Sequence, residues 1–226
     1  MPRTLADGPE TRAEAVRVLR AGGLVALPTD TVYGIAVALS TTAGIERLFA
    51  AKSRPPDRAI ALLLADAEQA AEIGEMNLAA AALGSAFWPG GLTLVVPRRT
   101  DRALPAALGG GHLAAGVTQT VGLRVPAHDA PRALARALGP LPTTSANRSG
   151  EPEARDAAEI EALLGDAIDL IVDGGPSAGG PASTVVDCTG PAPEIRRAGA
   201  VDVEAISRCL ESAGLPGVGR LPGVGR

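Results

Sequence analysis

The sequence is poor in aromatic residues and in cysteine. Only 2% of its 226 residues are aromatic, and it contains two cysteines. Proteins that hold single-stranded RNA stack the bases on aromatic side chains, so this chain has little material for such a surface. Cys188 and Cys209 form no CxxC pair, so neither a disulfide framework nor a structural zinc site is indicated. We expect both thiols to be free and buried.

Long hydrophobic runs and an excess of basic charge are also missing. The longest apolar run, residues 59–65, falls well short of the roughly 18 residues that suggest a membrane span. Residues 1–7 contain no apolar stretch behind a basic one, so no secretory signal is expected. The formal net charge is −4 and the pI is about 5.3, whereas dedicated nucleic-acid binders usually have a pI above about 9. These absences predict a cytoplasmic protein without a membrane segment.

Helical and strand patterns alternate along the chain. Apolar residues recur at helical spacing in several segments, and short apolar runs between them indicate strands. Helices are expected at residues 10–21, 42–51, 66–73, 77–87, 130–138 and 156–164, with a last helix capped by Asp202. Strands are expected at residues 24–27, 60–64, 92–96, 121–125 and 168–172, with 183–188 and 194–197 as an antiparallel end. This alternation predicts an α/β fold whose sheet is at least partly parallel.

No long linker divides the chain before its last residues. With 46% hydrophobic and 20% charged residues, residues 1–214 have the composition of one globular domain, which at this size buries about 70% of the unfolded chain's surface. The hexapeptide LPGVGR then occurs twice, at residues 215–220 and 221–226. A repeat of two such units, rich in proline and glycine, cannot build a solenoid. We therefore expect residues 215–226 to be a disordered tail.

Two polar segments contain side chains suited to phosphate or carboxylate oxygens. Residues 52–58 display Lys52, Arg54 and Arg58 around two prolines. Such cations suit a triphosphate in a protein without a P-loop, and a solvated basic turn is the alternative. Residues 143–150 offer hydroxyls, an amide and a cation, for which a helix cap or a Ser/Thr turn is the alternative.

Arg124 lies inside an otherwise apolar strand segment, residues 121–125. A charged side chain on a buried strand needs a partner. An internal Asp or Glu and a ligand anion are both candidates for that partner.

Several blocks of the sequence stand in a recognisable order and spacing. They are residues 28–34 (PTDTVYG), 52–55 (KSRP), 87–93 (FWPGGLT), 121–126 (VGLRVP) with 145–150 (SANRSG), and 183–189 (STVVDCT) with 197–199 (RAG). Taken together, they resemble the YrdC-like family of threonylcarbamoyl-AMP synthases over roughly residues 10–200. The resemblance implies a twisted mixed β-sheet flanked by helices, with a large concave groove.

The resemblance also implies an activity and the residues for it. The family condenses L-threonine, bicarbonate or CO2, and ATP with Mg2+ into threonylcarbamoyl-AMP and diphosphate, and a partner transferase then modifies the tRNA adenosine beside the anticodon. The implied catalytic residues are Lys52 and Arg54, and the implied ATP-binding residues are Lys52, Arg54, Arg58, Thr120, Ser145, Asn147 and Arg197. The implied threonine-binding residues are Thr31, Arg124, Thr143 and Ser183, and no metal-binding side chain is expected.

Two alternative functions fit parts of the sequence. A double-stranded RNA-binding or ribosome-assembly module would use the same groove, with weak RNA binding, but the low pI argues against it. A carbamoyl-adenylate-forming domain, as in hydrogenase-maturation proteins, would use carbamoyl phosphate and belongs to chains with additional domains. Threonine-dependent release of diphosphate separates the synthase from both alternatives.

Overall fold

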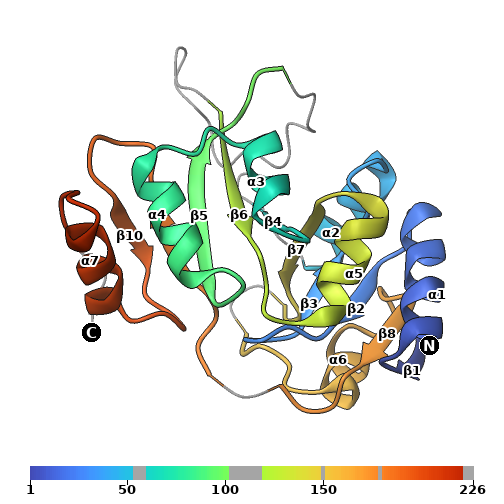
Figure 1. The fold of residues 1–226 in the computed structure, drawn as a ribbon. Helices are drawn as coiled ribbons and strands as arrows, with labels where there is room; N and C mark the ends of the chain where they lie inside the picture. The colour runs from blue at the N-terminus through green and yellow to red at the C-terminus, as the bar shows by residue number, and fades with distance from the viewer. Residues whose placement is uncertain (53–59, 102–118, 149–150, 178–179, 221–226) are drawn as a thin grey trace.

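One mixed β-sheet crosses the whole molecule (Figure 1). This computed structural model describes residues 1–52, 60–101, 119–148, 151–177 and 180–220. The strands in these ranges are β1 (Arg3–Ala6), β2 (Val25–Leu27), β3 (Gly34–Ala36), β4 (Ala61–Leu63), β5 (Leu92–Pro97), β6 (Thr120–Arg124), β7 (Leu141–Ser145), β8 (Leu170–Asp173), β9 (Thr184–Asp187), β10 (Glu194–Arg197) and β11 (Gly219–Arg220). Their order in the sheet is β1-β8-β2-β3-β7-β4-β6-β5-β9-β10-β11.

Parallel and antiparallel pairs are mixed along this sheet. The pairs β1–β8, β2–β8, β4–β6, β5–β9 and β10–β11 are parallel. The pairs β2–β3, β3–β7, β4–β7, β5–β6 and β9–β10 are antiparallel. The expected α/β fold with a partly parallel sheet and an antiparallel end at β9 and β10 is therefore confirmed.

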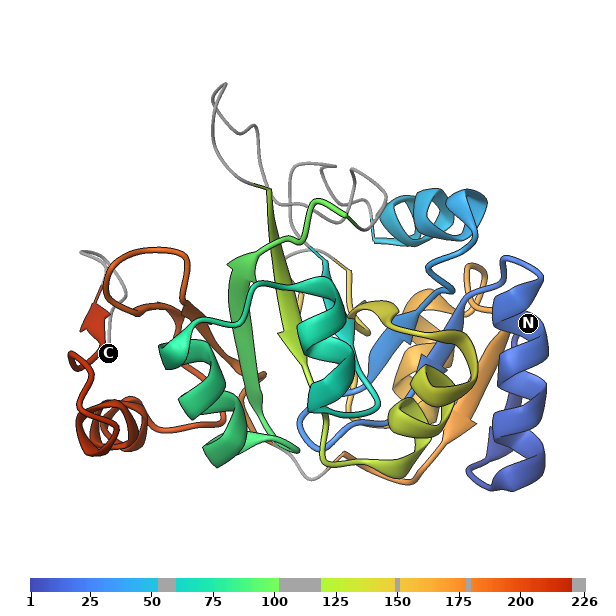
Figure 2. The same ribbon diagram turned by 45° about the horizontal axis from the view of Figure 1, so that its top comes forward.

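Helices cover the sheet on both sides. In the described ranges they are α1 (Pro9–Arg20), α2 (Thr42–Ala51), α3 (Ala67–Ile73), α4 (Leu78–Phe87), α5 (Asp129–Leu138), α6 (Ala157–Leu164) and α7 (Val203–Ser212). Five of them begin at a side chain that accepts a hydrogen bond from the first turn: Asp66, Asn77, His128, Asp156 and Asp202. These caps satisfy backbone N–H groups that have no partner inside the helix. Figures 1 and 2 show α1 beside α5 near the N-terminus and α4 beside α7 near the C-terminus.

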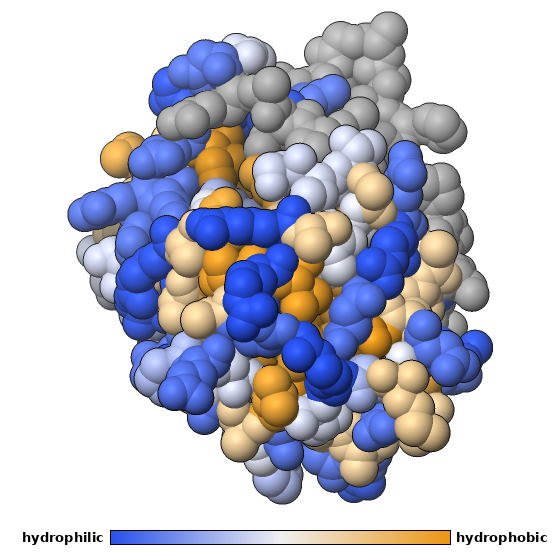
Figure 3. Space-filling model, turned by 90° about the vertical axis from the view of Figure 1, so that its right-hand side faces the viewer, coloured by the Kyte–Doolittle hydropathy of each residue, from blue (hydrophilic) through white to orange (hydrophobic). Residues whose placement is uncertain are grey.

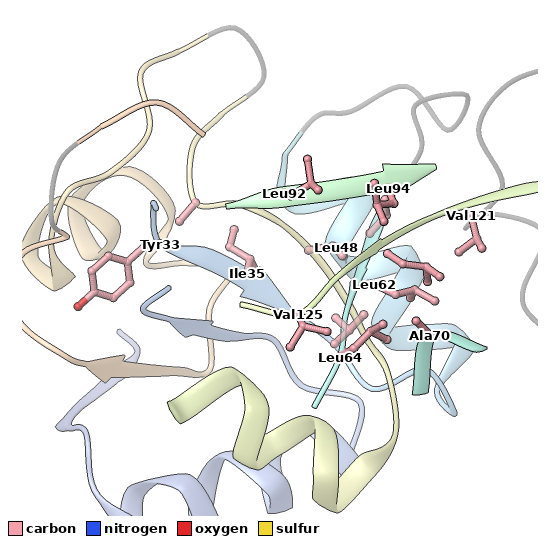
Figure 4. Close-up of a cluster of buried hydrophobic side chains, with 14 of the residues drawn as sticks. Tyr33, Ile35, Leu48, Leu62, Leu64, Ala70, Leu92, Leu94, Val121 and Val125 are labelled. Carbon is pink, nitrogen blue, oxygen red and sulfur yellow. The ribbon is translucent and has the colours of Figure 1, made fainter. Parts of the chain in front are cut away.

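Successive residues of the central strands belong to two different hydrophobic clusters. In β2, Val25 and Leu27 pack in the cluster that α1 and α5 cover, whereas Ala26 belongs to the larger second cluster. Figure 4 shows part of this second cluster, in which Leu62 of β4 lies near Leu94 of β5. Because side chains alternate between the faces of a strand, a sheet buried on both faces needs such continuously apolar strands.

The edge of the sheet near the N-terminus is exposed. All residues of β1 are exposed, and Arg3 forms an ion pair with Glu14 of α1. Figure 3 shows the side of the molecule on which α1 lies, where hydrophilic residues are interleaved with smaller apolar areas. Within the described ranges, no helix is long and apolar enough to cross a membrane.

The expected helices are all present, with bounds that differ by a residue or two. Four strands, β1, β3, β7 and β11, were not expected. Strand β7 has the sequence Leu-Pro-Thr-Thr-Ser, whose hydroxyl groups indicated a binding loop. Threonine is β-branched and suits a strand, and Thr143 and Thr144 are both buried in the middle of the sheet.

The two cysteines differ in their surroundings. Both are free, but only Cys188 is buried and Cys209 is partly exposed. Burial raises the pKa of the Cys188 thiol to about 12, with the nearby Asp187 carboxylate contributing. The expectation of two buried thiols therefore holds for Cys188 alone.

The start of the repeated hexapeptide is ordered, contrary to the expectation of a disordered tail. Gly219 and Arg220 form β11 and pair in parallel with Glu194 and Ile195 of β10. Leu215 and Val218 pack against the larger hydrophobic cluster. The expectation missed this packing because a leucine and a valine separated by proline and glycine show no helical or strand period. The second copy, residues 221–226, lies outside the described residues.

Candidate functional site

A cavity of about 250 Å³ opens between strands that are far apart in the sequence. Every second residue of β6 faces it, namely Thr120, Gly122 and Arg124, while Val121 and Leu123 pack in the hydrophobic core. The other polar side chains that line it are Thr29, Thr31, Tyr33, Thr93, Thr143, Thr144, Ser145, Ser183 and Arg197. Apolar side chains from β4, β5 and β9 form the floor between them: Ala61, Leu63, Val95 and Val185.

Arg124 is held in the cavity wall by three neighbours. Its Nε donates to the carbonyl oxygen of Gly90 at 3.0 Å, and one terminal nitrogen donates to Thr31 Oγ1 at 2.9 Å. The other terminal nitrogen donates to Asp30 Oδ1 at 2.7 Å, and the two side chains are 7% and 17% exposed, respectively. Gly90 follows a cis peptide bond between Trp88 and Pro89.

Burial lowers the pKa of the Arg124 guanidinium, and the Asp30 carboxylate acts in the opposite direction. A guanidinium nevertheless stays charged in a protein, so the pair is ionic. Of the two partners considered from the sequence, the internal acid is therefore present. Asp30 does not line the cavity, so the carboxylate supports Arg124 from behind the wall.

Arg197 and Ser183 form a second polar cluster at the cavity. Arg197 donates to the Ser183 carbonyl oxygen from Nε at 3.0 Å and to Ser183 Oγ at 3.0 Å. Ser183 Oγ also lies 2.8 Å from Thr93 Oγ1. A Cβ atom on Gly199 would lie 2.7 Å from the Ser183 carbonyl oxygen and would clash with Ala182. Glycine at position 199 thus allows the backbone contact that brings Arg197 to Ser183.

Lys52 lies behind Ser145, which lines the cavity, at the C-terminal end of α2. Its ammonium donates to the Ser145 carbonyl oxygen at 2.6 Å and to Asn147 Oδ1 at 2.7 Å. Thr144 Oγ1 also lies within hydrogen-bonding distance at 3.3 Å. Lys52 is only 3% exposed, so the alternative in which residue 52 belongs to a solvated basic turn does not hold. The strong acceptors at the end of β7 provide the polar environment that a buried ammonium requires.

The structure brings most of the expected site residues together. Those that line the cavity are Thr31, Thr120, Arg124, Thr143, Ser145, Ser183 and Arg197. Lys52 and Asn147 are one hydrogen bond from this lining, through Ser145. Thr143 donates its hydroxyl to the Leu141 carbonyl oxygen, which orients it within its own strand. Arg54 and Arg58 lie outside the described residues.

Several contributors to this site carried no expected role, among them Asp30, Thr93 and Gly122. Asp30 and Thr93 stand inside sequence blocks of the resemblance, but nothing in the sequence connected them to Arg124 or Ser183. Gly122 is the third, because a residue without a side chain gives no chemical signal. The alternation of β6 was the available signal, since it places residue 122 on the same face as Thr120 and Arg124.

Comparison of the sequence with known protein families shows to which family this chain belongs. The Sua5/YciO/YrdC family model, described as "Telomere recombination", matches residues 17–199. The chain belongs to the Sua5/YciO/YrdC family. It is 36% identical over 200 residues to threonylcarbamoyl-AMP synthase of Bacillus subtilis, covering 88% of this chain and 56% of that protein. It is 37% identical over 207 residues to a putative threonylcarbamoyl-AMP synthase of Mycobacterium tuberculosis, covering 89% and 92% of the two chains.

A solved structure of another Sua5/YciO/YrdC protein has the same fold. Sua5 from Pyrococcus abyssi, crystallised with L-threonine, superposes with a TM-score of 0.84 at 31% identity. The match covers 97% of this chain and 62% of that one. The chain thus spans little more than half the length of some relatives and nearly all of the mycobacterial one. The implied YrdC-like fold is therefore confirmed.

Proposed function

We propose that this protein is an L-threonylcarbamoyladenylate synthase, a nucleotidyltransferase that makes threonylcarbamoyl-AMP and diphosphate from L-threonine, bicarbonate or CO2, and ATP. The observation that carries the proposal is the single cavity in which side chains from every described block of the resemblance meet or adjoin. The relatives named as threonylcarbamoyl-AMP synthases support it, because they match most of this chain. The product is the intermediate for N6-threonylcarbamoyladenosine (t6A) in tRNA.

In this proposal the Arg124 side of the cavity binds threonine. The guanidinium receives the amino acid's carboxylate, sharing its charge with Asp30, and Thr31 and Ser183 supply hydroxyls for the polar groups. Thr143 lies on β7, which β4 separates from β6 in the sheet, and completes the subsite. Arginine suits a carboxylate because its planar fork offers two parallel N–H donors.

The other side of the cavity binds ATP. Lys52, Arg54 and Arg58 neutralise the phosphates, and Thr120, Ser145 and Asn147 complete the nucleotide site on that side. Arg197 also binds the nucleotide, from the Ser183 side of the cavity. In the described residues no group of three His, Cys, Asp or Glu side chains is placed to hold a metal ion. We therefore assign Mg2+ to the substrate complex MgATP, since this ion keeps several waters and binds through phosphate oxygens.

The chemistry needs positioning and charge neutralisation. The threonine amine adds to CO2 and releases a proton to solvent, which gives a carbamate. A carbamate oxygen attacks the α-phosphorus, and diphosphate leaves with the electrons of the broken P–O bond. Holding both substrates in one cavity converts the encounter into a step between neighbouring groups. The cations of the site stabilise the charge that develops on the phosphate oxygens.

The product would pass to a threonylcarbamoyl transferase, which carries out the step on tRNA. This protein therefore needs no stable RNA contact of its own, although weak RNA binding is compatible with the cations of the cavity. We propose that the reaction takes place in the cytoplasm.

The test is a diphosphate-release assay with ATP, Mg2+ and bicarbonate, with and without L-threonine, and mass spectrometry of the product. The proposal expects threonine-dependent release and the mass of threonylcarbamoyl-AMP. Release driven by carbamoyl phosphate instead would favour the carbamoyl-adenylate alternative. Binding of double-stranded RNA by well-folded protein that releases no diphosphate would favour the RNA-binding module.

A variant pair ties the activity to the cavity. Arg197→Ala removes a charged donor to the nucleotide, and such hydrogen bonds contribute about 1.5–3 kcal/mol, so activity should fall about ten- to a hundredfold. Arg208→Ala on α7 is the matched control, because Arg208 is exposed and pairs with Glu204. Equal activity of the two variants would remove Arg197 from the nucleotide site.

A further inference from the structure

Strand β6 connects the two proposed subsites. Thr120, Gly122 and Arg124 point to the cavity from successive positions on one face of this strand. Residues two apart along a strand are separated by about 6.6 Å. Thr120 belongs to the proposed ATP side and Arg124 to the proposed threonine side, so Gly122 lies at the junction between them.

The fold itself does not require glycine at position 122. Its φ angle is not in the left-handed region, so no backbone conformation excludes a side chain. A Cβ atom there would lie 3.6 Å from Thr93 Cγ2 and 3.8 Å from Ala61 Cβ, which are ordinary van der Waals distances. A glycine inside a strand weakens it and often marks the close approach of a ligand. Gly122 weakens β6 in this way in the centre of the sheet, where β6 pairs with both β4 and β5.

We propose that Gly122 is the shared floor under the two substrates, and that its missing side chain leaves the space in which the reacting groups meet. This inference rests on the proposed function and names where the carbamate and the α-phosphate lie. Ala61 and Val95, the register partners of Gly122 on either side, also line the cavity and carry no charge. The floor is therefore apolar, and the polar groups that orient the substrates stand at its two ends.

The reaction makes this space critical. A bond forms between the carbamate oxygen and the α-phosphorus, and the bond from that phosphorus to the diphosphate oxygen breaks on the opposite side. The attacking oxygen must approach in line with the leaving group. A methyl group at position 122 would increase the distance between the two substrates. Displacements of about 1 Å can lower a rate about a hundredfold while leaving each substrate's own contacts intact.

The test is Gly122→Ala, with Gly190→Ala as its matched control. Gly190 lies in the exposed connection between β9 and β10, and its added Cβ would also meet a neighbour at 3.6 Å, the Ala192 carbonyl oxygen. We expect kcat of threonine-dependent diphosphate release to fall about a hundredfold in Gly122→Ala. The Kd of L-threonine and of a non-hydrolysable ATP analogue, each measured alone by calorimetry, should stay near the wild-type values. The Tm should not fall, since alanine is less costly than glycine in a strand.

Two outcomes overturn the proposal. A wild-type kcat in Gly122→Ala would show that no reacting group lies over position 122. Loss of affinity for one substrate alone, as large as the loss of kcat/KM, would place Gly122 inside that subsite rather than at the junction. Failure of the proposed function is a separate result, because wild-type and Gly190→Ala protein would then also lack threonine-dependent release.

A second variant covers the case in which Gly122→Ala does not fold. Ala61→Val adds methyl groups to the same space from β4, because Ala61 is paired with Gly122 and also lines the cavity. The proposal expects the same loss of kcat with unchanged affinity for each substrate alone. Undiminished kcat in folded Ala61→Val protein would overturn it.

Discussion

The Asp30–Arg124 pair sets the charge of the proposed threonine side of the cavity. An arginine with an internal counter-ion attracts a ligand anion less strongly than an uncompensated arginine would. The hydrogen bonds from Arg124 to Gly90 and Thr31 fix the guanidinium in the wall at the same time. Asp30 therefore lowers the affinity for a ligand carboxylate and raises the stability of the ligand-free protein.

Asp30→Asn separates these two effects. It keeps an oxygen acceptor for Arg124 but removes the compensating charge, so the free energy of unfolding should fall by about 2 kcal/mol, less than for a fully buried pair because Asp30 is 17% exposed. The carboxylate of L-threonine then becomes the counter-ion, and L-threonine should raise the Tm of the variant more than that of the wild type. Differential scanning fluorimetry measures both, with threoninol, which lacks the carboxylate, as the control ligand. Equal Tm shifts in both proteins would contradict this account.

For single residues, the sequence predicted which residue types belong to the candidate site better than it predicted which residues contact one another. Arg124 was predicted to need a charged partner because it interrupts an apolar strand, and this prediction is confirmed. The identity of the partner depends on how residues 28–34 fold back over β6, which no local pattern contains. Lys52 was predicted to bind anions from a turn, whereas the buried acceptors of β7 hold it inside the protein.

Strand β11 shows how a short element attaches a terminus to the sheet. Its backbone pairs with β10, and the Gly219 amide donates to the Pro193 carbonyl oxygen at 2.9 Å. The Leu215 amide donates to Leu210 at the end of α7. The first hexapeptide thus covers one edge of the sheet, and exposed edges are prone to pair with other chains.

Truncation tests this attachment. Deleting residues 215–226 removes the packing of Leu215 and Val218, which we value at about 2 kcal/mol together, so the Tm should fall by about 5 °C. Deleting residues 221–226 alone keeps β11 and is the matched control. Thermal melts of both truncations decide the point. A loss of Tm that is equal for the two deletions would show that the first copy contributes nothing.

The helices and most strands could be predicted from the sequence because the patterns that indicate them lie within a few neighbouring residues. Asp66, Asn77, Asp156 and Asp202 cap helices where a polar side chain precedes an apolar period. Strands β3 and β11 are too short to show a period, and every residue of β1 is exposed. Their pairing comes from the neighbouring strands, so only the assembled sheet reveals them.

The whole molecule is organised around one continuous sheet. Strand order cannot be deduced from the sequence, because β8 returns from late in the chain to lie between β1 and β2. The cavity likewise combines β3 and β7 with β5 and β9, which come from distant parts of the sequence. The cavity therefore exists only when most of the sheet is formed.

From this organisation we propose that residues 1–220 unfold as one cooperative unit. Calorimetry should give one transition whose calorimetric and van't Hoff enthalpies agree. Leu94→Ala in β5 should shift that single transition downward by an amount equivalent to about 2–5 kcal/mol, because Leu94 is fully buried in the core. A variant that melts in two steps, with the α1 end retained, would show instead that the chain contains two units.

The burial of Lys52 has a chemical consequence for the product. Every other basic side chain that could reach a substrate is arginine or histidine, since the sequence contains a single lysine. An acyl phosphate anhydride such as threonylcarbamoyl-AMP acylates free amines, and the guanidinium of arginine remains protonated and is a poor nucleophile. With its one lysine ammonium engaged by Ser145 and Asn147, the protein would hold the proposed product with cations that do not react with it.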